Sequence, residues 1–380
     1  NSTNVVSGLD FTNLNLNGTL TQTVCSLPNL THLLLRFNNF TQPFPLFLLD
    51  LCPHLTYLDL SQNWFYGDLP ANISALTKLQ YLSLESNYFT GPIPADFGRL
   101  PDLTLLRLRG NRLEGPIPPE LGNLSNLQKL DLAYTFPENS SVYRVIPAEL
   151  GNLTNLESLE LMGSNFLGSI PSSLGGLSHL SMLDLSGNNL TGIVPPSLAN
   201  LTSIQYFYLY DNQLSGPLPQ LGHLDDLIDI EMSGNYFNGT IPESFATLSS
   251  LYKLHLFSNQ LSGTLPQGLE FLPNLTTLVL YNNLWGEISS EWGLHTTGLN
   301  QFDVGNNNFS GPLPPHLCHS GTIQYISFMN NGMNGTIPDN YGFECESLLR
   351  FRVDGNFLSG SVPSGLWTRP KDTLTLQNNM

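Results

Sequence analysis

Residues 103–118 read Leu-Thr-Leu-Leu-Arg-Leu-Arg-Gly-Asn-Arg-Leu-Glu-Gly-Pro-Ile-Pro, and their skeleton, LxxLxLxxNxLxGxIP, returns about every 24 residues along the chain. A fixed period of this length means that each repeat is one small structural unit that completes its core only by stacking on its neighbours. Taking the first apolar residue of each Leu-x-Leu pair, sixteen repeats start at Leu9, Leu33, Leu58, Leu82, Leu106, Leu130, Leu159, Leu183, Phe207, Ile230, Leu254, Leu278, Phe302, Ile326, Phe351 and Leu374.

This skeleton is typical of a leucine-rich repeat, and each of its letters has a physical role. In Leu-x-Leu the period of two points the leucines inward and the x residues outward, as a short strand requires. The Asn of each repeat, such as Asn111 or Asn188, can bond to backbone groups that are left free where the chain leaves the strand. We therefore predict an α/β leucine-rich repeat solenoid, a right-handed superhelix with a parallel β-sheet on its inner face and IxGxIP repeats.

The continuous repeat favours one elongated domain over residues 1–380, although the length alone would suit two or three domains. The chain carries 13 basic and 30 acidic residues, a net charge of −17. This charge argues against nucleic acid as a partner and favours cationic partners such as a basic peptide. Because the chain lacks a signal sequence before Asn1 and has incomplete terminal caps, we expect a trimmed extracellular piece whose anchor lies elsewhere.

The four cysteines predict two disulfides. Cys25 and Cys318 each lie eight residues before a repeat start, and Cys52 and Cys345 each lie six before one. Of the three possible pairings, only Cys25 with Cys52 and Cys318 with Cys345 joins adjacent coils, where the spacing suits a disulfide. An oxidising compartment follows from these bridges.

Fourteen Asn-x-Ser/Thr sequences are candidates for N-glycosylation. Such sequences can also arise by chance in a repeat rich in Asn, Ser and Thr, but their number favours a secreted protein. The candidates are Asn1, Asn17, Asn29, Asn39, Asn72, Asn123, Asn139, Asn152, Asn189, Asn200, Asn238, Asn274, Asn308 and Asn334.

Catalytic groups do not gather in any convincing pattern. His316 and His319 flank Cys318, but that cysteine is expected in a bridge, so a metal site is not predicted. Asp59, Asp131 and Asp184 recur at one outward strand place, which indicates a habit of the repeat more than an acid/base pair. We therefore predict a binding protein without enzymatic activity or cofactor in this chain.

The outward residues of the inner sheet form the expected binding surface, because a solenoid holds them at fixed spacing. Aromatic groups beside carboxylates, ending in two arginines, suit an extended peptide whose terminal carboxylate enters a guanidinium clamp. The plain alternative is a solvated face, although two arginines on one strand are uncommon in this chain. The candidates are Tyr206, Tyr208, Tyr210, Asp229, Glu231, Lys253, His255, Phe257, Tyr281, Asp303, Tyr325, Met329, Arg350 and Arg352.

The strand Arg350-Phe351-Arg352, followed by Val-Asp-Gly-Asn-Phe-Leu-Ser-Gly, resembles the Arg-x-Arg strand of plant leucine-rich repeat receptor kinases that perceive small secreted peptides. The IxGxIP form of the repeat is likewise typical of plant extracellular repeats. Within this group the chain is most similar to the HAESA and HAESA-like receptors. The similarity lies in residues 60–63, in the elongated coil that leads to residues 146–157, and in residues 209–216.

This resemblance implies the extracellular ectodomain of a single-pass plasma-membrane receptor whose cytoplasmic Ser/Thr kinase lies outside this chain. It implies binding of a short, proline-hydroxylated peptide of the abscission (IDA-like) class and recruitment of a SERK-type co-receptor near the C-terminal coils. Arg350 and Arg352 would hold the peptide's C-terminal carboxylate and last side chain. Where HAESA-type receptors have Glu, this chain has Tyr208, so recognition of the central hydroxyproline would differ or shift to Glu231.

Two alternatives remain open from the sequence. A receptor for a CLE-type peptide is one, since those receptors also resemble this chain in their Arg-x-Arg strand. A secreted inhibitor of pathogen polygalacturonases is the other, because it has the same repeat, although such inhibitors are usually shorter and lack the arginine strand.

Overall fold

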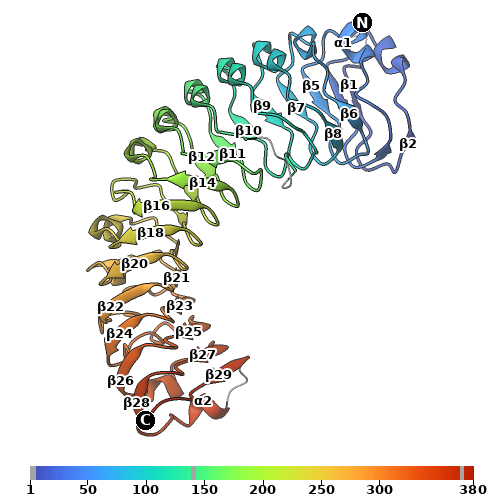
Figure 1. Ribbon diagram of the computed structural model, residues 1–380. Coiled ribbons are helices and arrows are strands. Elements are labelled where there is room, and N and C mark those ends of the chain that lie inside the picture. Colours follow the sequence, from blue (N-terminus) through green and yellow to red (C-terminus); the bar gives the residue numbers. More distant parts are fainter. Residues whose placement is uncertain (1–5, 138–142, 369–371) are drawn as a thin grey trace, which may run out of the picture. The chain divides into compact units, whose positions relative to one another are not determined.

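The computed structural model describes residues 6–137, 143–368 and 372–380 (Figure 1). Internal contacts divide the chain into unit 1, Asn1–Thr191, and unit 2, Gly192–Met380, and each unit is described by itself. The single continuous domain stays a prediction. Among the described residues, no helix is long and apolar enough to cross a membrane.

Each unit is built on a parallel sheet of three-residue strands, one strand per repeat, so the predicted leucine-rich repeat solenoid with a parallel sheet is confirmed. The middle residue of each strand is the repeat start predicted from the sequence. Unit 1 contains, in spatial order, β1 (Gly8–Asp10), β3 (His32–Leu34), β5 (Tyr57–Asp59), β7 (Tyr81–Ser83), β9 (Leu105–Arg107), β10 (Lys129–Asp131), β11 (Ser158–Glu160) and β13 (Met182–Asp184). Unit 2 contains β15 (Tyr206–Tyr208), β17 (Asp229–Glu231), β19 (Lys253–His255), β21 (Thr277–Val279), β23 (Gln301–Asp303), β25 (Tyr325–Ser327), β27 (Arg350–Arg352) and β29 (Thr373–Thr375).

A second short strand follows the Asn of the repeat skeleton in most repeats, and this strand was not predicted from the sequence. These strands also pair in parallel between neighbouring coils, because stacking brings equivalent backbone within hydrogen-bonding distance. In unit 1 they are β2 (Asn17–Gly18), β4 (Asn39–Phe40), β6 (Tyr66–Asp68), β8 (Tyr88–Thr90) and β12 (Leu167–Gly168), and β14 (Asn189–Gly192) lies at the end of that unit. In unit 2 they are β16 (Gln213–Pro217), β18 (Tyr236–Gly239), β20 (Gln260–Gly263), β22 (Asn283–Glu287), β24 (Asn308–Gly311), β26 (Gly332–Thr336) and β28 (Phe357–Ser359).

The return segment of each coil is a short helix or an irregular loop. Many of these helices begin directly after the Pro of Ile-Pro or Leu-Pro, whose fixed φ suits the start of a helix. The α-helices are α1 (Phe47–Leu51) and α2 (Gly365–Thr368). The 3-10 helices are η1 (Gln22–Ser26), η2 (Ile73–Ala75), η3 (Ala95–Arg99), η4 (Pro119–Asn123), η5 (Ala148–Asn152), η6 (Ser172–Gly176), η7 (Pro196–Asn200), η8 (Glu243–Thr247), η9 (Leu269–Phe271) and η10 (Asp339–Gly342).

Buried asparagines join each coil to the next, as the sequence predicted. The Nδ2 group of Asn111 donates to the carbonyl of Leu108 at 2.7 Å and to that of Leu84, in the preceding coil, at 3.0 Å. Its Oδ1 accepts the amide of Phe89 at 3.1 Å. Because these backbone groups are buried, one side chain satisfies donors and acceptors that water cannot reach.

Two coils in unit 1 replace the ladder Asn by a hydroxyl residue. Thr135 donates to the carbonyl of Leu108 at 3.2 Å, and Ser164 donates to that of Leu132 at 2.7 Å. Ser164 also accepts the backbone amide of Thr135 at 3.2 Å. A hydroxyl group thus supplies the donor to the preceding coil, but it has one hydrogen to share between carbonyls where an amide has two.

Replacing a ladder Asn is expected to destabilise the fold strongly. Asn111→Ala leaves the buried amide of Phe89 without its partner and removes one of the two side-chain donors to each of the carbonyls of Leu84 and Leu108. We expect a loss of about 2–3 kcal/mol in the free energy of unfolding. Urea unfolding followed by circular dichroism measures this loss. Asn126→Ala, which removes an exposed bond to the carbonyl of Pro101, is the matched control and should change stability by no more than about 0.5 kcal/mol.

Candidate functional site

The register of strands β15 to β27 places the outward side chains of unit 2 in two parallel rows, here called the unit 2 track. The first row holds the first residue of each strand and the second row holds the third. Neighbours in a row are about 4.8 Å apart, the distance between adjacent strands. The first row is Tyr206, Asp229, Lys253, Thr277, Gln301, Tyr325 and Arg350, and the second row is Tyr208, Glu231, His255, Val279, Asp303, Ser327 and Arg352.

The structure thus brings the predicted site residues onto one surface. Ten of the fourteen candidates lie in the two rows, and the other four, Tyr210, Phe257, Tyr281 and Met329, lie two residues beyond a strand. Most of them are partly exposed, as expected for a surface that a ligand can reach. Thr277, Val279, Gln301 and Ser327 occupy equivalent row positions and were missing from the predicted site. Their place in the repeat was the signal that could have found them.

Asp229 corrects one expectation, because it is not open to a ligand. Only 8% of it is exposed, and its Oδ2 atom accepts the hydroxyl of Tyr208 at 3.1 Å and pairs with Nζ of Lys253 at 3.2 Å. Tyr208 and Lys253 therefore both occupy the same carboxylate oxygen of Asp229. Asp229 therefore holds Tyr208 and Lys253 in place and presents little of its own charge.

Glu231 and His255 form a close pair in the second row. Nδ1 of His255 lies 2.5 Å from Oε2 of Glu231, and the other carboxylate oxygen accepts the hydroxyl of Ser233 at 2.5 Å. Both oxygens of Glu231 are therefore engaged within the chain. The atom of this pair that lacks a partner among the described residues is the buried Nε2 of His255.

The next part of the unit 2 track is formed by Phe257, Tyr281 and Asp303. Phe257 and Tyr281 have ring centroids 5.6 Å apart, and the hydroxyl of Tyr281 donates to Asp303. Burial raises the pKa of Asp303 above its ordinary value, against the hydrogen bonds from Tyr281 and from the amide of Gly305, which lower it. Burial, and next the bond to Asp303, raise the pKa of Tyr281. The phenol therefore remains a neutral donor at any physiological pH.

Arg350 and Arg352 lie side by side in the two rows on β27. The guanidinium of Arg350 is 5.4 Å from the ring centroid of Tyr325 and its side chain is exposed. Arg352 is partly buried, and its Nε atom has no hydrogen-bond partner among the described residues. Neither arginine is within ion-pair distance of a carboxylate in the described part of the chain. The two cations are therefore available to an anionic group.

Unit 1 carries charged residues on its own strands, and these engage one another. Oε2 of Glu160 lies 3.8 Å from Arg109, whose guanidinium also lies 5.2 Å from the ring centroid of Tyr134. Asp131 and Asp184 each accept the backbone amide two residues later, which closes the turn after the strand. These aspartates are structural, in agreement with the interpretation of the sequence.

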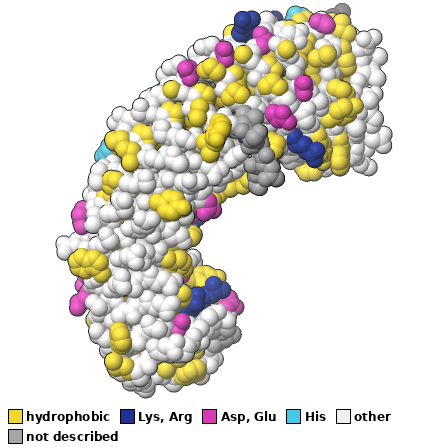
Figure 2. All heavy atoms as spheres, in the orientation of Figure 1, with side chains coloured by type: hydrophobic (Ala, Val, Ile, Leu, Met, Phe, Trp, Pro, Cys, Tyr) yellow, Lys and Arg dark blue, Asp and Glu magenta, His cyan; other side chains and the backbone are white. Residues whose placement is uncertain are grey.

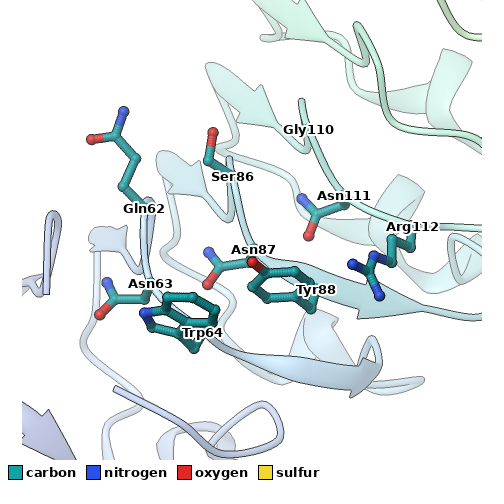
Figure 3. Close-up of a pocket in the computed structure, with 9 residues that line it drawn as sticks. All are labelled: Gln62, Asn63, Trp64, Ser86, Asn87, Tyr88, Gly110, Asn111 and Arg112. Atoms are coloured by element: carbon teal, nitrogen blue, oxygen red, sulfur yellow. The ribbon is translucent and has the colours of Figure 1, made fainter. Parts of the chain in front are cut away.

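Unit 1 has a hollow of about 420 Å³ that none of the predicted site residues lines (Figure 3). Its polar floor consists of the ladder residues Asn63, Asn87 and Asn111. Trp64 and Tyr88 form one wall, with ring centroids 5.3 Å apart, and Arg112 lies 4.7 Å from the centroid of Tyr88. None of these wall residues was among the predicted site residues.

Both predicted disulfides form. Cys25 is bonded to Cys52 and Cys318 to Cys345, with Cα–Cα distances of 5.3 and 4.8 Å.

Asn1 and Asn139 lie outside the described residues, and the other candidate glycosylation residues are exposed or, for Asn189, partly exposed. Within the described residues, His, Cys, Asp and Glu nowhere gather in threes that could hold a metal ion.

Comparison with known families agrees with this geometry. The leucine-rich repeat region family matches residues 45–166, and leucine-rich repeat families match residues 152–214, 226–248, 250–272 and 298–320, together more than half of the chain. The chain is a leucine-rich repeat protein. Receptor-like protein 31 of Arabidopsis thaliana is 31% identical over 94 residues, which are 24% of this chain and 11% of that protein.

Solved structures of plant leucine-rich repeat receptor ectodomains have the same fold. The Arabidopsis receptor kinase HAESA, in complex with the peptide hormone IDA and the co-receptor SERK1, is 36% identical with a TM-score of 0.94, over all of this chain and 63% of that chain. A TDR receptor is also 36% identical, with a TM-score of 0.93, over 98% of this chain and 64% of that chain. This leucine-rich repeat protein thus spans less than two thirds of either structure and about a tenth of the curated relative.

The acidic group of unit 1 predicts a pH-dependent stability. Burial, and next the charge of Glu160, raise the pKa of Asp131 to about 6. A raised pKa favours the folded state at low pH, and this contribution is lost as pH rises through about 6. Between pH 4 and pH 7, wild type should lose about 2–3 kcal/mol of unfolding free energy that Asp131→Asn does not lose, measured by urea unfolding at each pH. An unchanged pH dependence in the variant would contradict this reading.

Proposed function

We propose that this chain is the extracellular ligand-binding domain of a plant receptor kinase and that it binds a short secreted peptide along the unit 2 track. The peptide lies extended across β15 to β27, with its C-terminal carboxylate between Arg350 and Arg352. The observation that carries the proposal is this pair of guanidinium groups, which have no carboxylate partner among the described residues although the chain has more than twice as many acids as bases.

Unpaired polar atoms on the track support a polar ligand. A buried donor or acceptor without a partner costs about 1–3 kcal/mol, which a ligand or water that bonds to it recovers. Nε2 of His255 and Nε of Arg352 are two such atoms. A peptide backbone supplies both acceptors and donors at the spacing of a strand, so it suits this surface better than a purely apolar ligand.

The class of peptide is the finer part of the proposal. We favour a proline-hydroxylated peptide of the abscission (IDA-like) class, because such a peptide is basic near its end and the chain is acidic. Since both oxygens of Glu231 are engaged by Ser233 and His255, we expect the hydroxyproline to meet the hydroxyl of Tyr208 or the imidazole of His255. A CLE-type peptide is the alternative, and the affinities of the two peptide classes for this chain would separate them.

The proposal also includes a co-receptor and a cellular location. HAESA was crystallised with the co-receptor SERK1, and we propose that a SERK-type co-receptor joins this chain after the peptide binds. The two disulfides fit an oxidising compartment, and we place the domain on the extracellular face of the plasma membrane.

Removing the two guanidinium groups should abolish most of the peptide affinity. We expect Arg350→Ala/Arg352→Ala to weaken binding by about 2–5 kcal/mol, because a carboxylate in the complex would lose its charged partners. Titration calorimetry of the secreted protein against synthetic abscission-class and CLE-class peptides measures this and identifies the preferred class.

Two controls make the test specific. Arg99→Ala removes an exposed arginine of η3, whose side chain is 80% exposed, and should leave the affinity unchanged. A peptide with an amidated C-terminus should bind wild type more weakly but should bind the double variant as well as the free acid does. If the double variant binds the free acid as tightly as wild type, the proposed clamp is wrong.

A further inference from the structure

Several large aromatic side chains stand exposed on the second strands or beside them. On the face drawn in Figure 2, exposed hydrophobic side chains form separate patches between polar surface. Trp64, Trp285 and Phe357 are 50%, 55% and 54% exposed. Covering such a ring is favourable, because water contact with a large apolar surface is unfavourable.

Each of these three aromatic residues lies next to an exposed Asn of a glycosylation sequence. Trp285 is the register partner of Asn308 between β22 and β24, and Phe357 is the register partner of Asn334 between β26 and β28. Register partners on parallel strands point to the same face about 4.8 Å apart. Asparagine and aromatic ring therefore stand side by side and both face solvent.

The third pair, Asn39 and Trp64, is joined directly. Nε1 of Trp64 donates to Oδ1 of Asn39 at 3.4 Å. The ring contact that the described residues give Trp64 is with Tyr88 of the following coil, at an interplanar angle of 17° (Figure 3). Because the rings stack along the direction of the repeats, the opposite face of the indole is turned toward the coil of Asn39.

The chemistry of an N-glycosidic bond directs a sugar toward this face. A sugar on Nδ2 makes the side-chain amide a secondary amide, which is planar and trans, so the sugar lies on the same side as Oδ1. In Asn39 that side is where Trp64 lies. The C–H groups on one face of a pyranose ring pack on an aromatic face, and its hydroxyl groups remain in water.

We infer that Asn39, Asn308 and Asn334 carry N-glycans whose first sugar packs on Trp64, Trp285 and Phe357. The occupant of these exposed aromatic groups is then a modification of the same chain and not another protein. In unit 1 this places the glycan of Asn39 beside Trp64, which lines the hollow. This inference requires secretion of the chain but does not depend on peptide binding.

The test uses variants that remove the glycan without altering the pair. Thr41→Ala, Ser310→Ala and Thr336→Ala each destroy one glycosylation sequence and keep its Asn and its aromatic neighbour, whereas Thr41→Ser, Ser310→Thr and Thr336→Ser keep the sequence. Wild type and all six variants are expressed as secreted proteins in plant or insect cells. Peptide mass mapping gives the occupancy of each Asn, and limited oxidation by N-bromosuccinimide gives the reactivity of each tryptophan.

We expect occupied Asn39 and Asn308 in wild type and several-fold faster oxidation of Trp64 in Thr41→Ala and of Trp285 in Ser310→Ala. Trp367, which is 60% exposed on α2, is the internal control and should react equally in every variant. An unoccupied Asn39 or Asn308, or equal reactivity of Trp64 and Trp285 with and without the glycan, would overturn the inference. Calorimetry with the peptide is independent of these readouts, so either proposal can fail alone.

Discussion

The structure depends on how backbone polar groups are satisfied between one coil and the next. A three-residue strand cannot bond all the groups of the turn that follows it, and water does not reach them. The ladder asparagines provide the missing partners with three or more bonds each, as Asn87 and Asn111 illustrate. Because each ladder Asn bonds to a carbonyl of its own coil and to the equivalent carbonyl of the preceding coil, the spacing of the coils is fixed by side-chain geometry as well as by apolar packing.

A fixed spacing is what makes the surface of unit 2 suitable for recognition. Side chains in the two rows of the track keep their distance from their neighbours, so an extended ligand would meet a series of positions that are already ordered. The interactions within the track also divide its residues into two kinds. Asp229 pairs with Lys253, and Glu231 bonds to His255, whereas neither arginine of β27 has a carboxylate partner among the described residues. In the proposed complex the arginines would therefore supply the charge that meets the ligand.

The sides of the repeats serve a different purpose from the strand faces. The second strands present polar residues, sequences for glycosylation and isolated aromatic rings, and the proposed glycans would cover those rings. A covered side would leave the track as the open surface for a peptide. This division fits a protein that works outside the cell, where two disulfides further hold the coils of Cys25 and Cys318 to their neighbours.

The sequence by itself determined the repeat. Its apolar period placed the centre of every inner strand, its asparagines predicted the ladder, and its cysteine offsets predicted both disulfides, because each depends on spacing along the chain alone. The side-chain partners on the track were decided only by the tertiary structure. Asp229 looked like its outward neighbours in the sequence, but in the structure it is buried and bonded to Tyr208 and Lys253. The second strands form only because stacked coils bring short segments within hydrogen-bonding distance of one another. The repeat skeleton does not encode which outward side chains pair with one another between coils, so the register and packing of neighbouring coils had to supply these partners.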